Sequence, residues 1–249
     1  MKFDIILKEE IDSTNSFVNK RYLANNASDG LVVRALFQTN GKGLQTNTWH
    51  SSKAQNLLVS IGLNLDFIQP ENQFVITKVV SLALLETLRK YINEPSNLAI
   101  KWPNDLYWEK NKLAGILIKN MISGNKMDYS IIGIGLNVNE KTFPSTIPNP
   151  ISMSQIVGND LDCEQILSEL LLHLQSNFSQ LKRDIKALDQ KYLQNLLYFQ
   201  QMADYYYDGK VIKAKIENVT SYGHLLLKTQ EDQLISCDLK EIEFIHKSP

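Results

Sequence analysis

Five consecutive residues, Lys101–Asp105 (KWPND), combine side chains that could act on a charged ligand: a cation, a large aromatic ring, a proline, an amide and a carboxylate. The apolar run Leu98–Ile100 before them is typical of a strand. Pro103 should end or turn that strand, because proline lacks an N–H and fixes its own φ. Lys101 and Trp102 would then lie at a strand end, where proteins often present ligand contacts. Alternatively, Trp102 is a core residue and Pro-Asn-Asp is an ordinary surface turn.

The loop Gln38–Trp49 offers a second polar group, with Gly41 and Gly43 on either side of Lys42. Glycines let backbone N–H groups approach an anion closely, and the lysine adds positive charge. The loop is not a Walker loop, because the spacing Gly-x-x-x-x-Gly-Lys is absent. By itself, Gly-Lys-Gly is more often part of a plain polar surface loop.

Three shorter sequences also carry polar groups in suggestive places. Lys112 opens a short apolar run in which Gly115 would let a ligand approach the strand backbone. The run Gly133–Asn139 alternates glycine with apolar residues, and the amide of Asn137 near its end could contact a polar ligand edge. Ser13-Thr14-Asn15 is typical of a helix cap. Each of the three has a purely structural explanation when it is taken alone.

Composition bounds the possible functions. The 249 residues suffice for one large core and a small second domain. A net charge of −1 leaves no excess of cations to follow a phosphate backbone, so we expect no general nucleic-acid binding. No apolar run approaches the ~18 residues needed to span a bilayer, so we expect no membrane association. Without a signal peptide, Cys163 and Cys237 are expected to be reduced thiols of a cytoplasmic protein.

The hydrophobic pattern indicates the elements that must position these groups. Apolar residues at helical spacing predict helices after the caps at 12–15, over 74–92 and over 163–199. Apolar and alternating runs predict strands over 31–37, 56–65, 98–108, 112–119 and 129–138. Short β-type runs typical of a small antiparallel barrel follow over 210–216, 224–228, 234–238 and 243–245. We therefore expect two domains, 1–202 and 203–249.

Taken together, the five clusters resemble biotin–protein ligases of the single-function type. They occur in the family's order, and KWPND followed by the KLAGIL run that begins at Lys112 is a specific combination. The resemblance covers essentially the whole chain. It implies an α+β fold, with a mixed or antiparallel sheet like that of class II aminoacyl-tRNA synthetases and flanking helices. It also implies a small C-terminal β-barrel of the Src-homology-3 type.

The resemblance further implies a two-step reaction. Biotin's carboxylate attacks the α-phosphate of ATP to give biotinyl-5′-AMP and pyrophosphate, with Mg²⁺ on the phosphates. A lysine of a biotin carboxyl carrier domain, part of a biotin-dependent carboxylase, then attacks the mixed anhydride, and AMP leaves. The first step brings two anions together, so cations and N–H dipoles must line the site.

By motif match, the resemblance assigns each candidate residue a role. Lys112 and Lys42 are the expected electrostatic catalysts. The residues expected to bind biotin are Ser13, Thr14, Asn15, Gln38, Lys42, Gly43, Leu44, Lys112 and Gly115. Those expected to bind ATP are Gly41, Trp49, Lys101, Asn104, Asp105 and Asn137. No metal ligands are assigned, because His50, His173, His224 and His246 lack ligand spacing. Monomer and homodimer both remain open.

The chain departs from the family in two places. The family's loop usually reads Gly-Arg-Gly-Arg-x-Gly-Arg, whereas this one has Lys42, Leu44, Thr46 and Asn47 at the substituted positions. Lysine lacks the bidentate fork of arginine, so we expect a looser hold on the adenylate. Only twelve residues precede Ser13-Thr14-Asn15, whereas two-function members carry a helix-turn-helix domain there. We therefore expect no repressor activity on DNA.

Three alternatives remain. A lipoate–protein ligase would share the adenylation chemistry but would carry an Arg-Arg-x-Ser-Gly-Gly-Gly type of loop, which this chain lacks. A protein that binds biotin or biotinyl-adenylate without turnover would suit the arginine-poor loop. Finally, residues 204–249 could form an independent interaction domain, instead of closing the ATP site or docking the acceptor.

Overall fold

The computed structural model describes residues 1–44 and 47–245, and its main element is a seven-stranded mixed sheet. The strand order is β1-β2-β3-β7-β6-β5-β4. The strands are β1 (Asp4–Ile11), β2 (Leu31–Gln38), β3 (Leu57–Leu63), β4 (Leu98–Lys101), β5 (Asp105–Trp108), β6 (Asn111–Ser123) and β7 (Lys126–Leu136). β1 runs parallel to β2, and the other neighbouring strands are antiparallel.

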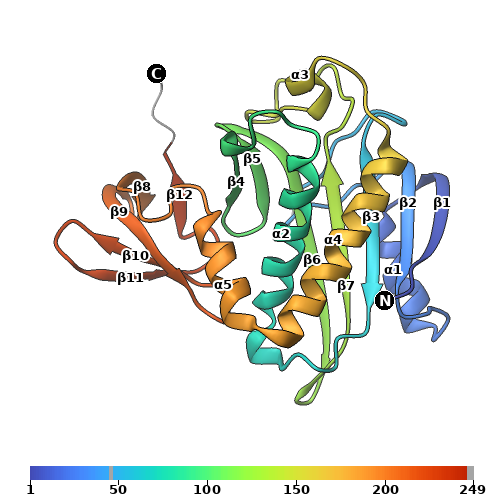
Figure 1. Cartoon of the computed structure of the whole chain (residues 1–249), viewed down its shortest axis with the longest axis horizontal. Coiled ribbons are helices and arrows are strands. Elements are labelled where there is room, and N and C mark those ends of the chain that lie inside the picture. The colour runs from blue at the N-terminus through green and yellow to red at the C-terminus, as the bar shows by residue number, and fades with distance from the viewer. Residues whose placement is uncertain (45–46, 246–249) are drawn as a thin grey trace.

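Helices cover both faces of this sheet. Figure 1 shows α2 (Phe74–Arg89) and α4 (Cys163–Arg183) side by side across one face, where they bury the main core. On the other face, α1 (Thr14–Leu23) packs against β2, β3 and β7 and buries Val18. The chain also forms the short helix α3 (Met153–Val157) and the helix α5 (Ile185–Gln194). Two 3₁₀ turns lie at Pro70–Asn72 and Pro95–Asn97.

Five further strands follow in the C-terminal unit. Their order is β11-β10-β9-β8-β12, and all neighbours are antiparallel. They are β8 (Ala203–Tyr207), β9 (Lys210–Val219), β10 (Leu225–Thr229), β11 (Leu234–Cys237) and β12 (Ile242–Phe244). The unit lies beyond β4 (Figure 1), and its buried side chains join the main core. The fold is therefore α+β, with a mixed sheet and a small antiparallel sheet.

Most predicted elements are confirmed, and the exceptions have physical reasons. The helical pattern over 163–199 is interrupted at Asp184, whose side chain caps α5 by accepting from Ala187 N. Helix α5 then ends at Gln194. β1 was missed because it is an edge strand, and its Ile5 and Leu7 remain exposed. β8 and α3 were also missed. Among the helices that the structure describes, none is long and apolar enough to cross a membrane.

Candidate active site

A cavity of about 460 Å³ opens over the sheet beside the start of α1. Its floor includes three glycines of two neighbouring strands, Gly115 on β6 and Gly133 and Gly135 on β7. The indole of Trp49 lies against Gly135 and Gly115, and a Cβ at Gly135 would overlap the ring. The close approach that the glycine pattern predicted is therefore made, in part, by a side chain of the Gln38–Trp49 loop.

One end of the cavity is lined by a polar cluster at the start of α1. Ser13 caps the helix by accepting from Ser16 N, and it also lines the cavity. Gln38 Oε1 accepts from Thr14 N at 2.8 Å and lies 3.0 Å from Thr14 Oγ1. Asn15 Nδ2 lies 3.4 Å from Leu117 O. The helix cap and the cavity wall are thus made by the same residues.

Another part of the lining carries charges held by the sheet. Lys112 Nζ lies 2.8 Å from Asp105 Oδ1, and both side chains are largely buried. Lys101 Nζ donates to Tyr107 Oη at 3.2 Å and lies over the rings of Tyr107 and Phe244. Burial lowers the pKa of the Lys101 ammonium from its ordinary value; neighbouring Asp105 opposes this effect and Lys112 adds to it.

The loop limbs at the mouth of the cavity are joined through backbone groups. Lys42 forms an antiparallel bridge with Thr48, and Trp49 N donates to Gly41 O at 3.0 Å. The Lys42 side chain is exposed, and within residues 1–44 and 47–245 it makes no ion pair. Thr46, one of the predicted departures from the family pattern, lies outside the described residues.

Thirteen of the fifteen predicted site positions line this one cavity. They are Ser13, Thr14, Asn15, Gln38, Lys42, Gly43, Leu44, Trp49, Lys101, Asn104, Asp105, Lys112 and Gly115. The ammonium-bearing residues Lys42, Lys101 and Lys112 therefore share a cavity. Their individual roles remain predictions.

Gly41 and Asn137 do not line the cavity. Asn137 is 4% exposed, and its Nδ2 donates to Ile151 O at 3.0 Å. The side chain thus joins the end of β7 to the segment before α3 instead of facing a ligand. At Gly41, an added Cβ would lie 2.5 Å from Trp49 O, so the glycine allows the two limbs of the loop to approach.

Sequence reasoning assigned no site residues to the C-terminal unit. Leu239, Lys240, Ile242, Glu243 and Phe244 line the cavity, although no motif marks them. This placement favours the expectation that residues 204–249 close the site over their alternative role as an independent module.

Trp102, the aromatic residue of KWPND, connects the large sheet to the C-terminal unit. Trp102 lines the cavity, is 4% exposed and donates from Nε1 to Gly223 O at 2.9 Å. Gly223 in turn packs against the ring of Phe74 on α2. Trp102 is therefore both a buried residue, as the structural alternative held, and part of the cavity wall.

The described residues contain no cluster of three or more His, Cys, Asp or Glu side chains that could hold a metal ion. The cavity lining includes two carboxylates, Asp105 and Glu243. Any divalent ion there would need most of its oxygen ligands from a bound phosphate.

Comparison with known proteins identifies the family. The curated bifunctional ligase/repressor BirA of Bacillus spizizenii is 27% identical over 255 residues, covering 95% of this chain and 73% of that protein. The biotin–[acetyl-CoA-carboxylase] ligase of Mycobacterium tuberculosis is 27% identical over 170 residues, covering 68% of this chain and 61% of that protein. The structure of biotin protein ligase from Aquifex aeolicus in complex with biotin and ATP matches with a TM-score of 0.79 at 26% identity, covering 98% of this chain and 99% of that one.

The model of one protein family matches residues 7–137, just over half of the chain. That stretch includes the polar cluster at α1, the Gln38–Trp49 loop, KWPND and the glycine floor. The chain belongs to the biotin/lipoate A/B protein ligase family.

Proposed function

We propose that this chain is an ATP-dependent biotin–protein ligase, which activates biotin as biotinyl-5′-AMP and transfers the biotinyl group to a lysine of a biotin carboxyl carrier domain. One observation carries the proposal: Lys42, Lys101 and Lys112 share a single cavity with the polar cluster at the start of α1. Such a cavity suits a ligand with a polar head at one end and an anion at the other. The ligases of known activity among the relatives support the same conclusion.

The polar cluster suits the ureido head of biotin. Ser13, Thr14 and Gln38 present hydroxyl and amide groups that can donate to the ureido oxygen and accept from its N–H groups. The Trp49 indole lies against Gly115 and Gly135, and the Asn15 amide lies against Gly133, so these two side chains would flank the bicyclic ring. The biotin carboxylate would then extend towards Lys112.

The lysines suit the adenylation step. A carboxylate oxygen of biotin attacks the α-phosphorus, the bond to the β-phosphate breaks, and pyrophosphate leaves. Lys112 is held by Asp105 and can stabilise charge on the transferring phosphate without first being reoriented. Lys42 would reach the phosphates from the loop side. The Trp49 indole would contact the adenine, and its Nε1 has no hydrogen-bond partner among the described residues.

Transfer requires the acceptor amine to attack the acyl carbon of the mixed anhydride. The carbon–oxygen bond to the phosphate then breaks, AMP leaves with the bonding pair, and the amine loses a proton. Lys112 and Lys101 would stabilise the departing phosphate, because both face the same cavity.

Mg²⁺ fits the site only as a partner of the nucleotide. Magnesium commonly binds through one or two carboxylates plus substrate phosphates, and Asp105 and Glu243 are the carboxylates available in the described lining. Asp105 already pairs with Lys112, so the phosphates would supply most of the remaining ligands. The bound ion would neutralise charge on the triphosphate.

Several finer expectations form part of the proposal. The predominantly antiparallel large sheet with helices on both faces supports a class II aminoacyl-tRNA-synthetase-like core. The five short antiparallel strands support a Src-homology-3-like C-terminal barrel, divided from the core near Met202. The unpaired buried thiols of Cys163 and Cys237 suit a cytoplasmic location.

One assay tests the function. The protein is incubated with ATP, Mg²⁺ and an apo carrier domain, with either biotin or lipoate, and the carrier's intact mass is measured. We expect an ATP-dependent biotinyl mass shift. A lipoyl shift instead would identify a lipoate ligase. Tight biotin binding with neither pyrophosphate release nor transfer would identify a binding protein and overturn the proposal.

A further inference from the structure

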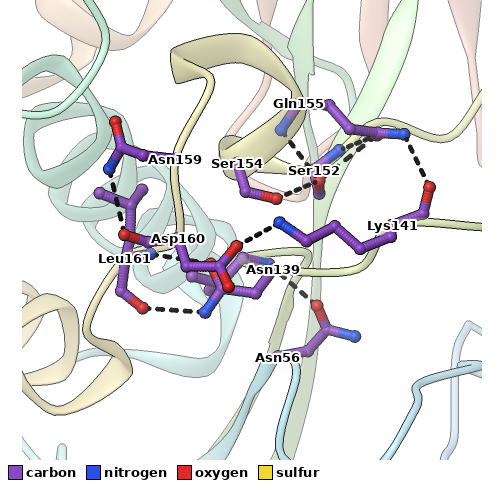
Figure 2. Close-up of polar contacts among 10 residues, drawn as sticks. Asn56, Asn139, Lys141, Ser152, Ser154, Gln155, Asn159, Asp160 and Leu161 are labelled. Atoms are coloured by element: carbon purple, nitrogen blue, oxygen red, sulfur yellow. Dashed lines mark hydrogen bonds and ion pairs between the residues drawn. The ribbon is translucent and has the colours of Figure 1, made fainter.

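The chain after β7 forms a polar junction on the side of the cavity away from the C-terminal unit. In Figure 2, Asn139 exchanges hydrogen bonds with the backbone of Leu161, donating from Nδ2 and accepting at Oδ1, each at 2.9 Å. Lys141 pairs with Asp160 beside it. The segment Val138–Lys141 is therefore fastened to the chain that enters α4.

The same segment holds a carboxylate that has no cation. Glu140 is 3% exposed and makes no ion pair among residues 1–44 and 47–245. Its oxygens accept from Ser52 N at 2.9 Å, Ser52 Oγ at 2.6 Å and Asn56 Nδ2 at 2.6 Å. Burying a carboxylate is costly unless donors compensate, and these three donors do so. Such an arrangement holds its partners in a defined geometry.

Asn56 bonds to the same segment at a second point, before Glu140. Its Oδ1 accepts from Val138 N at 2.9 Å, and its Nδ2 also reaches Ser51 Oγ at 3.2 Å. Asn139 N donates to Gln55 O at 2.8 Å. The stretch 51–56 is thus joined to the end of β7 by both backbone and side-chain bonds.

This stretch directly follows the returning limb of the Gln38–Trp49 loop. Ser52 follows Trp49 by three residues, and Trp49 N is bonded to Gly41 O next to Lys42. Strand β7 and the segment after it therefore support the loop at two points: Gly135 on β7 lies under the indole of Trp49, and Glu140, beyond the end of β7, holds Ser52 in the chain that follows the loop.

We propose that Glu140 is a positioning residue for the nucleotide end of the site. By fixing Ser52, it sets where Trp49 lies above β7 and, through the paired limbs, where Lys42 enters the cavity. That Trp49 and Lys42 contact the nucleotide rests on the proposed function. The segment Val138–Lys141 then anchors the Gln38–Trp49 loop. Glu140 touches no ligand in this scheme.

Two matched substitutions test the link. Glu140→Ala removes the buried acceptor, and Asp160→Ala removes a carboxylate from the exposed ion pair of the same junction. We expect Glu140→Ala to raise the KM for ATP by about tenfold or more, because small misplacements of binding groups cost large factors. The KM for biotin should change less than about threefold, since Ser13, Thr14 and Asn15 lie at the start of α1 and outside the segment that Glu140 holds. Asp160→Ala should leave both values unchanged.

A conservative variant separates positioning from mere stability. In Glu140→Gln, the remaining oxygen can accept from Ser52 N and Asn56, while the new amide donates to the Ser52 hydroxyl. We therefore expect Glu140→Gln to recover most of the ATP affinity. Hydrogen exchange of peptides covering residues 47–56, measured without ligand, should be faster in Glu140→Ala and close to the parent in Glu140→Gln and Asp160→Ala.

The outcomes are distinguishable from a failure of the proposed function. If the parent protein shows no adenylation, the function is wrong, while the exchange experiment still tests the anchor. If Glu140→Ala does not fold, Ser52→Ala, which keeps the backbone N–H, should raise the KM for ATP by about two- to threefold, the loss of one of three bonds. An unchanged KM for ATP in a folded Glu140→Ala protein, or equal exchange in all variants, would overturn the inference.

Discussion

The cavity has two charged sides that are built differently. On the sheet side, Lys112 is fixed by Asp105 and by backbone bonds to Asn149 and Ile151. On the loop side, Lys42 is exposed and makes no ion pair with any other described residue. One cation is positioned before a ligand arrives, whereas the other depends on the backbone geometry of its loop.

Under the proposed function, the difference predicts separate roles in adenylation for the two sides. A preorganised charge stabilises a developing anion without a reorganisation cost, so the sheet side suits the chemical step. A side chain without a partner gains its interactions only when the ligand binds, so the loop side suits retention of the adenylate. Substitutions on the two sides should therefore affect different kinetic constants.

The largest effect is expected on the sheet side. Lys112→Ala should lower adenylate formation by at least ~10²-fold, the scale of losing one preorganised charge contact. The rate is measured as pyrophosphate release, with Lys119→Ala on the exposed part of the same strand as the control. Near-normal release by Lys112→Ala would contradict the assignment of this lysine.

A second substitution disturbs the support under the loop. Gly135→Ala should displace Trp49, because the added methyl group overlaps the indole. We expect the KM for ATP to rise by about tenfold or more, as a misplaced binding group would cause. Gly115→Ala is the graded comparison, since its Cβ would lie 3.0 Å from the same ring and so requires a smaller shift. Equal values for both variants and the parent would show that Trp49 does not contact the nucleotide.

A third change strengthens the weaker side. Leu44→Arg introduces a bidentate cation at a position that lines the cavity. Release of preformed biotinyl-adenylate should slow by about tenfold, the equivalent of one additional charge-assisted hydrogen bond. The rate of release is measured with labelled biotinyl-adenylate. If the parent protein already releases adenylate as slowly as an arginine-rich ligase, the arginine-poor loop has no effect on retention.

The smallest effect concerns pH. Burial lowers the pKa of Lys101 below the ordinary lysine value of 10.5, so its ammonium is lost at lower pH than that of a free lysine. As the pH is raised, the rate of adenylation should therefore begin to fall before pH 10.5 is reached. Lys101→Arg, which stays protonated, should shift the decline to higher pH. Identical alkaline profiles would mean that Lys101 does not control this limb.

The predictable parts of the site are those that depend on residues close together in the sequence. Pro103 predicted a turn after the strand, and β4 and β5 do form a hairpin there. The alternating glycines predicted a close approach, which Trp49 makes. These features follow from the backbone properties of single residues, so sequence alone exposes them.

The remainder depends on contacts between distant segments. Leu239–Phe244 carries no motif, and it lines the cavity only because the C-terminal unit packs beside β4. Asn137 looked like a ligand contact, but its amide is used by Ile151 O. Glu140 resembled any polar residue after a strand, because neither burial nor its donors could be read from the chain.

The hydrogen bond between Trp102 and Gly223 bears on how the gene product could be shortened. A truncation ending at Met202 would keep every motif yet remove the partner of a buried indole N–H and part of the cavity lining. The apolar surface that the unit covers would then be exposed to water, at roughly 25 cal/mol for each Å². The predicted boundary near Met202 therefore separates the seven-stranded sheet and its helices from the five-stranded sheet, but it would also divide the lining of one cavity.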